Sequence, residues 1–223
     1  MGYHKRHAFA TASERVLNEK LRALFSRRGF EPARKRVEVD AALSVGADTL
    51  GGGLVSAETV LDCEARTGRC FYVRRDEAGE IEGFIALLYL SEAGYEALMR
   101  GRFDPSAPKM RHLTDGPDEP AEAIYVWCLA ARSEEGRRAL VRAVTEARRR
   151  AFPHIALFAR PVSREGRMMT AALDAPNGPA AFLGWVPVAP EEAGEEADQD
   201  AVKPGAAADD TSHKESTDGR FEA

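Results

Sequence analysis

The chain has 223 residues, which is long enough for one full domain and short of two ordinary ones. Its composition, 44% hydrophobic and 30% charged, is that of a globular protein, and no apolar run reaches the roughly 18 residues of a membrane span. The N-terminal segment is basic but has no apolar stretch behind it, so we expect no secretory signal, no membrane contact and a cytoplasmic location.

The net charge of −5 conceals an acidic C-terminus. Residues 189–223 carry 11 acidic and 3 basic side chains, a net charge of −8, so residues 1–188 carry +3. Because this tail has almost no apolar side chains to bury, we predict that it is disordered. It is either a solubilising tail or an acidic arm that competes with an anionic ligand for basic surface. Deleting residues 190–223 would distinguish the two through polyanion affinity at low salt.

The three cysteines, Cys63, Cys70 and Cys128, cannot all pair and show no spacing typical of a zinc site. We therefore expect small core residues and no metal.

The first expected helix follows Thr11 and Glu14, which fit a capping box. Gly29 and Pro32 end it. Its apolar stripe consists of Val16, Leu17, Leu21, Leu24 and Phe25.

Residues 33–55 combine a short alternating pattern, which indicates a short strand, with a break of three glycines. Ser56 then opens a short helix that Gly68 stops. We accordingly predict that residues 1–55 form an N-terminal helix and an irregular extension, packed on a domain of residues 56–188.

A β-hairpin is the clearest local prediction. Residues 70–74 and 81–90 are β-rich runs, and residues 76–79 between them have turn chemistry. Because residues 84–90 are apolar on both faces, the second strand is expected at the centre of a sheet.

The elements after the hairpin alternate between helices and strands. Residues 94–99 form a short helix or turn, residues 101–120 a long loop, residues 121–131 a strand, and residues 133–152 the longest helix, which Pro153 ends. The inward stripe of that helix is Ala139, Leu140, Ala143, Val144, Ala147 and Ala151.

A fourth strand in residues 154–162, a helix in 163–175 and a last strand in 181–188 complete the chain. This order predicts an α+β fold with a single mixed, mostly antiparallel sheet flanked by helices. The strands on either side of the longest helix should lie parallel, joined by a right-handed crossover.

Two motifs carry a resemblance to a known family. They are the hairpin "FYVRRDEAGEIEGFIALLYL", with Gly83 in its second strand, and the late "ARPVSREGRMM" followed by "FLGWVPV", with Gly184 and Trp185. Over residues 56–188 the chain resembles the GNAT superfamily of acyl-CoA-dependent N-acetyltransferases. The resemblance implies a V-shaped splay between two central parallel strands, with the pantetheine arm of the donor on one strand edge.

The resemblance further implies acetyl-CoA as acyl donor and an amine as acceptor, either a small molecule or a protein. The base is expected to be Glu122. Ala180 stands where the family has its tyrosine acid, so Tyr125 on the same strand as Glu122, or a water molecule, would serve as the acid. The pyrophosphate should lie on the turn before the longest helix, and the expected cofactor residues are Leu129, Ala131, Arg132, Ser133, Gly136, Arg137 and Arg138.

That turn permits two interpretations. The family motif has Arg or Gln, two residues, Gly, one residue and then Gly or Ala, whereas this chain reads "RSEEGR" from Arg132. As a phosphate site, the turn would rely on arginines to neutralise a diphosphate beside Glu134 and Glu135. As a plain helix start, Ser133 is the N-cap and both glutamates stabilise the helix dipole.

Two other functions stay open. A GNAT-like chain that has lost acyl-CoA chemistry would be a binding or regulatory protein. Nucleic-acid binding, which the acidic balance of the chain does not favour, would use the arginines of the longest helix, Arg137, Arg138, Arg142, Arg148, Arg149 and Arg150.

Overall fold

The computed structural model describes residues 18–161, 163–164, 166–168 and 181–183. Its sheet has six strands in the order β1-β2-β3-β4-β5-β6. Their bounds are β1 Phe30–Pro32, β2 Phe71–Arg75, β3 Ile81–Leu90, β4 Ala123–Ala131, β5 Ala156–Ala159 and β6 Ala181–Leu183. Strands β1 to β4 pair antiparallel, and β4–β5 and β5–β6 pair parallel. The predicted α+β class, with one mixed sheet, is confirmed.

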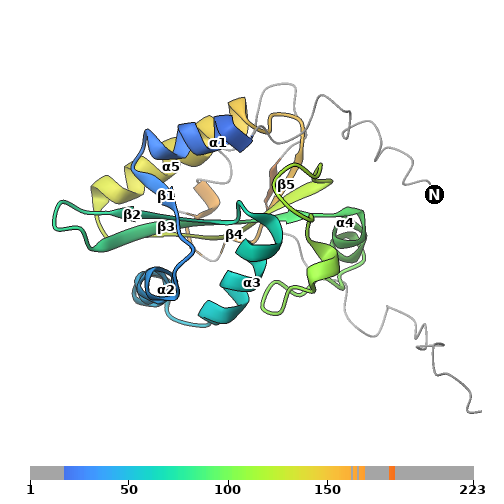
Figure 1. Cartoon of the computed structure of the whole chain (residues 1–223), viewed down its shortest axis with the longest axis horizontal. Helices are drawn as coiled ribbons and strands as arrows, with labels where there is room; N and C mark the ends of the chain where they lie inside the picture. Colours follow the sequence, from blue (N-terminus) through green and yellow to red (C-terminus); the bar gives the residue numbers. More distant parts are fainter. Residues whose placement is uncertain (1–17, 162, 165, 169–180, 184–223) are drawn as a thin grey trace, which may run out of the picture. The chain divides into compact units, whose positions relative to one another are not determined.

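Helices cover both faces of this sheet (Figure 1). Helices α1 (Asn18–Ser26) and α5 (Glu134–Arg150) lie on one face, and α2 (Arg36–Leu50) and α3 (Ala57–Thr67) lie on the other. Helix α4 (Glu92–Met99) and the short 3-10 helix η3 (Met110–His112) follow the end of β3. None of the helices in the described part of the chain is long and apolar enough to span a membrane.

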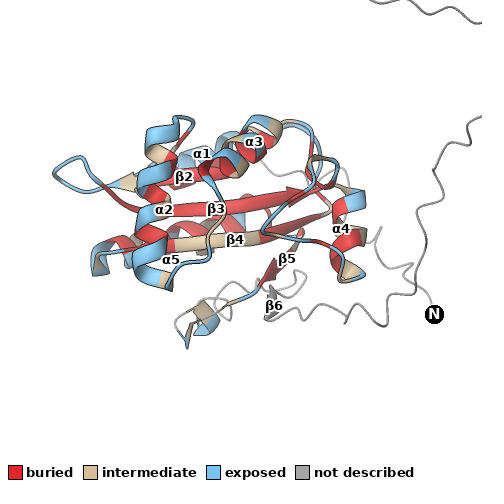
Figure 2. Ribbon diagram, turned by 90° about the horizontal axis from the view of Figure 1, so that it is seen from below, coloured by how far each residue is buried: buried red, intermediate tan, exposed pale blue. Residues whose placement is uncertain are grey.

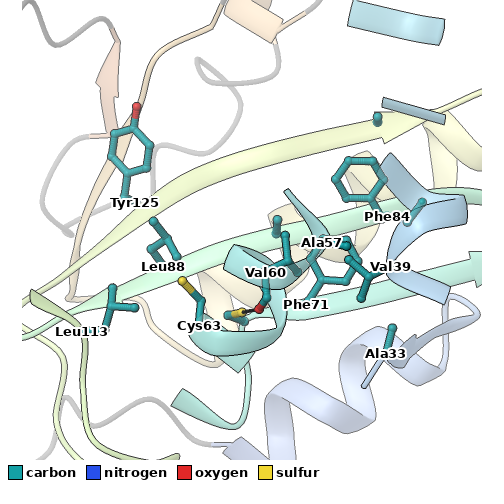
Figure 3. Close-up of a cluster of buried hydrophobic side chains, with 14 of the residues drawn as sticks. Ala33, Val39, Ala57, Val60, Cys63, Phe71, Phe84, Leu88, Leu113 and Tyr125 are labelled. Atoms are coloured by element: carbon teal, nitrogen blue, oxygen red, sulfur yellow. Dashed lines mark hydrogen bonds between the residues drawn. The ribbon is translucent and has the colours of Figure 1, made fainter. Parts of the chain in front are cut away.

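The central strand β3 separates two hydrophobic cores. All ten of its residues are buried, so the strand is red along its whole length in Figure 2. Phe84 and Leu88 face the α2/α3 core, while Ile85 and Leu87 face the α1/α5 core. Figure 3 shows the first of these cores, where side chains of α2 and α3 meet Phe71 and Phe84. The central position predicted for this strand is confirmed.

Helix α3 begins and ends as its sequence predicts. The Ser56 hydroxyl accepts a hydrogen bond from the Thr59 amide at 3.1 Å, and Gly68 adopts a left-handed φ of 67° at the C-cap. The hairpin, the strand before the longest helix, the longest helix itself and the parallel pairing of the strands around it are likewise confirmed.

The short strand expected after residue 33 is wrong, because Arg36–Leu50 is the helix α2. The alternating pattern rested on Val37 and Val39, but Val37 is 71% exposed. The buried side chains Val39, Ala42 and Val45 instead recur at a helical spacing. Gly51 then closes the helix in the left-handed conformation.

Several predictions lie outside the described residues. They are the capping box of Thr11 and Glu14, the stripe residues Val16 and Leu17, most of the helix in 163–175, the Gly184–Trp185 pair and the tail 189–223.

Candidate functional site

The candidate site begins where β5 stops pairing with β4. Four residue pairs join the two strands, from Ala123 with Ala156 to Val126 with Ala159. Strand β4 continues for five more residues, to Ala131. Among the described residues, no strand pairs with the β5-facing edge of this last part of β4. Backbone amide and carbonyl groups on an unpaired strand edge can bind an extended ligand.

A β-bulge marks the same point of β4. Ala86 faces Cys128 and Leu87 faces Val126, so Trp127 is an additional residue without an opposite partner. Trp127 and Cys128 both pack toward the α2/α3 core, and Leu129 packs toward the α1/α5 core. Residues 126–129 are only half-buried, and β4 is tan there in Figure 2. Bulges of this kind end strand pairing and redirect side chains, often beside functional sites.

Trp127 also holds the long loop that precedes β4. Its indole Nε1 donates a hydrogen bond to the Pro105 carbonyl at 2.8 Å. This bond joins the 101–120 loop to β4 at the bulge, so the loop has a fixed contact beside the unpaired strand edge.

The turn between β4 and α5 is a well-formed helix cap. The Ser133 hydroxyl accepts a hydrogen bond from the Gly136 amide at 2.8 Å. A Cβ on Gly136 would lie 3.0 Å from the Ser133 hydroxyl and 3.1 Å from Glu82 Oε2, so a side chain here would fit only if these two groups moved slightly. In the described part of the chain, the amides of Glu134 and Glu135 have no hydrogen-bond acceptor.

A buried carboxylate on β3 lies under this turn. Glu82 is 7% exposed, accepts a hydrogen bond from the Ser133 hydroxyl and forms an ion pair with Arg74 of β2. Its backbone carbonyl accepts from the Arg132 amide at 2.8 Å. Glu82 therefore joins β2, β3 and the start of α5 in one polar network.

Every arginine of the turn has an acidic partner. Arg132 pairs with Asp48 of α2 at 2.6 Å. Arg137 and Arg138 both pair with Glu134, at 2.9 Å and 3.1 Å. The hydrogen bonds from Arg137, with the positive charges of both arginines, lower the pKa of Glu134. The Glu135 carboxylate pairs with Arg74 at 2.6 Å, so the positive charge of this turn is neutralised within the protein.

The remaining expected cofactor residues face inward. Ala131 is buried in the α1/α5 core opposite Gly83, and Leu129 is partly buried on the same side. Their backbone groups, rather than their side chains, lie on the strand edge that the resemblance assigns to the donor.

Tyr125 lies in β4 beside the last pairs to β5. Its ring is 3% exposed and packs 5.6 Å from the ring of Phe103, and its strand partner on β5 is Phe158. In Figure 3 its hydroxyl points away from the core cluster. Burial raises the pKa of Tyr125, so the phenol is protonated at neutral pH and can act as a proton donor.

Glu122 lies one residue before β4, at the opposite end of the strand from the α5 turn. Its amide donates to the Leu90 carbonyl at 2.9 Å, and the residue is half-buried. At about 3.3 Å per strand residue, roughly 30 Å of β4 separates Glu122 from Ser133. The structure thus places the expected base and the expected pyrophosphate turn at the two ends of one strand.

Sequence reasoning missed Glu82, Arg74 and Asp48, which complete the charge network. The signal for Glu82 was present, because a single carboxylate inside the apolar run 81–90 needs a partner when that strand is buried. Its partners come from other elements, and no local pattern identifies them.

The face of α5 proposed for nucleic acid offers fewer available cations than its sequence suggests. Arg148 is fully buried and donates to the carbonyls of Phe152 and Ile155, each at 2.8 Å. Arg150 pairs with Glu146 at 3.2 Å. With Arg137 and Arg138 also paired, this face has fewer free cations than the six arginines indicated.

Within the described residues, no group of three or more His, Cys, Asp or Glu side chains could hold a metal ion. Comparisons with protein-family models, with curated proteins and with solved structures gave no match to this chain.

Proposed function

We propose that the protein transfers an acyl group, above all acetyl, from CoA to an amine. The observation that carries this proposal is the β4 edge past Val126, which lies between the end of β5 pairing and the N-terminus of α5. The pantetheine arm contains amide groups, which can hydrogen-bond to an unpaired strand edge as an added strand does. The V-shaped splay of a GNAT-like fold would correspond, in this proposal, to the point beside the Trp127 bulge where β4 and β5 stop pairing.

The pyrophosphate of the donor would bind at the start of α5. The free amides of Glu134 and Glu135 and the positive end of the helix dipole favour an anion there. The glutamate side chains must first release Arg137, Arg138 and Arg74. Because Glu134 and Glu135 are exposed, such ion pairs contribute little to stability, and a diphosphate can replace them.

In the transfer step the amine nitrogen attacks the thioester carbonyl carbon and the carbon–sulfur bond breaks. Glu122 takes the proton of the amine through a water molecule, and the protonated Tyr125 phenol donates its proton to the leaving thiolate. These roles use the carboxylate and the phenol at the start of β4.

Titration of acetyl-CoA into the full chain by calorimetry at low salt tests the proposal. Micromolar binding is expected, and its absence would eliminate the enzyme function. Glu122→Gln should retain this binding and lose thiol release from acetyl-CoA with a panel of amines. Full activity in that variant would refute the role of Glu122.

A non-catalytic binding or regulatory protein is the second candidate. The observation that favours it is the network of Glu82, Arg74 and Ser133, which stabilises the turn without any ligand. This candidate predicts no acetyl-CoA binding at all.

A further inference from the structure

A second region of the protein has the features of a ligand site. A pocket of about 420 Å³ lies between α4 and the segment that leads into η3. Its polar lining residues are Glu96, Arg102, Lys109, Arg111 and His112. A pocket of this volume suits a small molecule. It contains none of the residues assigned to acyl-CoA, so it does not depend on the proposed function.

The cations of this pocket have no partners among the residues that the structure describes. In the part of the chain that the structure describes, no hydrogen bond or ion pair engages the side chains of Arg102, Lys109 and Arg111. Arg111 lies in η3, Arg102 and Lys109 lie in the loop before it, and all three line the same cavity. Unpaired cations around a concave site attract an anionic ligand.

The imidazole of His112 completes the pocket wall. His112 is only 7% exposed, and its ring has no hydrogen-bond partner among the described residues. The ring packs 6.1 Å from the ring of Phe103. The ring nitrogens of His112 are not among the buried polar atoms that lack a partner, so they stay accessible to a ligand at this cavity.

The wall that carries His112 is held rigidly. The Ser91 amide donates to the His112 carbonyl at 3.0 Å, and the Ser91 hydroxyl donates to the Arg111 carbonyl at 2.8 Å. Gly94 of α4 lies so close that an added Cβ would be 2.0 Å from the His112 carbonyl oxygen. The backbone of the pocket is therefore positioned before any ligand arrives, which reduces the entropic cost of binding.

We propose that this pocket binds the phosphate group of a small phosphate monoester. The three cations and the single carboxylate of Glu96 leave a net charge of +2 while His112 is neutral. A phosphate monoester carries a charge of about −1.5 to −2 at pH 7, which this lining balances. Guanidinium groups also match phosphate oxygens with paired N–H donors.

Phenyl phosphate is a suitable probe, with benzoate as the monoanion of the same ring. We expect calorimetry on the full chain to show a dissociation constant on the order of 1 mM or below for phenyl phosphate, and at least roughly tenfold weaker binding of benzoate. The His112 ring proton signals in NMR should shift on titration. Equal binding of both compounds, or no binding of phenyl phosphate at millimolar concentration, would overturn the proposal.

Substitutions of the lining residues test whether phenyl phosphate binds at this pocket. Lys109→Gln combined with Arg111→Gln should weaken phenyl phosphate at least tenfold, and Arg100→Gln, an exposed cation at the end of α4 outside the pocket, is the matched control. Because Lys109 and Arg111 are exposed, the double variant should fold normally. Unchanged affinity in it would refute the site. The affinity of the double variant for acetyl-CoA tests the acyltransferase proposal separately, because failure to bind one of the two ligands does not affect the result for the other.

Discussion

The α5 turn and the α4–η3 pocket differ in whether their basic side chains are paired with carboxylates. At the turn, Arg74, Arg132 and Arg137 each have a carboxylate partner within 3 Å. At the pocket, the side chains of Lys109 and Arg111 have no partner among the described residues.

The difference separates charge that stabilises the fold from charge that is available to a ligand. The paired arginines of the turn connect α2, β2 and the start of α5, so part of their role is structural. A ligand at the turn must displace protein carboxylates, whereas a ligand at the pocket need only displace water. We therefore expect the pocket to bind simple phosphate compounds and the turn to require the additional contacts of a larger donor.

The largest expected effect comes from overpacking the contact between α4 and η3. In Gly94→Ala the new methyl group meets the His112 carbonyl, so α4 and η3 must separate. Overpacking of this kind should lower the free energy of unfolding by about 3 kcal/mol, measured by urea denaturation. Glu92→Ala, an exposed neighbour on the same helix, should have little effect. A Gly94→Ala protein as stable as the parent would contradict the close packing.

The next largest effect is expected at the α5 turn, where Glu82 and Glu135 both pair with Arg74 and Glu135 serves as the control. Glu82→Gln removes the buried charge that pairs with Arg74, and we expect a loss of about 2 kcal/mol in unfolding free energy. Glu135→Gln removes the exposed partner of the same arginine and should cost less than about 0.5 kcal/mol. Equal effects of the two substitutions would show that burial does not decide the strength of these pairs.

Trp127 links the open strand edge to the loop that leads to β4, and its effect should be smaller. Trp127→Phe loses the hydrogen bond to the Pro105 carbonyl, which should cost about 1 kcal/mol. If the loop is held by this bond, limited proteolysis within residues 101–120 should accelerate roughly fivefold, in proportion to local opening. Unchanged cleavage would show that other contacts hold the loop.

The smallest expected effect is a pH dependence at the pocket. Burial and the nearby charges of Arg111 and Lys109 lower the pKa of His112 from its ordinary value of 6.5. Between that lowered pKa and 6.5 the unfolded chain binds more protons, so stability should rise with pH through this window and fall as pH decreases. The other charged groups of the pocket are Glu96 and Arg102.

His112→Gln should flatten this part of the stability profile, measured as the denaturation midpoint against pH. A profile identical to that of the parent chain would mean that His112 does not titrate differently in the folded and unfolded states.

Much of the fold could be predicted from the sequence, because the relevant signals are local. The cap at Ser56, the turn at residues 76–79 and the apolar run 81–90 each indicate one structure within a few residues. Helix α2 was missed because Val37 and Val39 fit the alternating pattern of a strand. Only their burial in the structure shows that Val39, Ala42 and Val45 form the inward face of a helix.

The candidate sites were less predictable. Ser133 was identified as an N-cap from its position, and the structure agrees. The partners Glu82 and Asp48 come from distant parts of the chain, as do the contacts that bring Arg102 and His112 to one cavity. Such groupings depend on how elements pack, which a single sequence does not state.

One titration tests the central proposal, that the β4 edge and the α5 turn bind an acyl-CoA. Acetyl-CoA would be titrated by calorimetry into the parent chain and into a Glu134→Gln, Glu135→Gln variant, whose turn keeps its arginines but loses both competing carboxylates. We expect micromolar binding to the parent and roughly tenfold tighter binding to the variant, because two repulsive charges are removed. Absence of binding to both proteins would contradict the proposal.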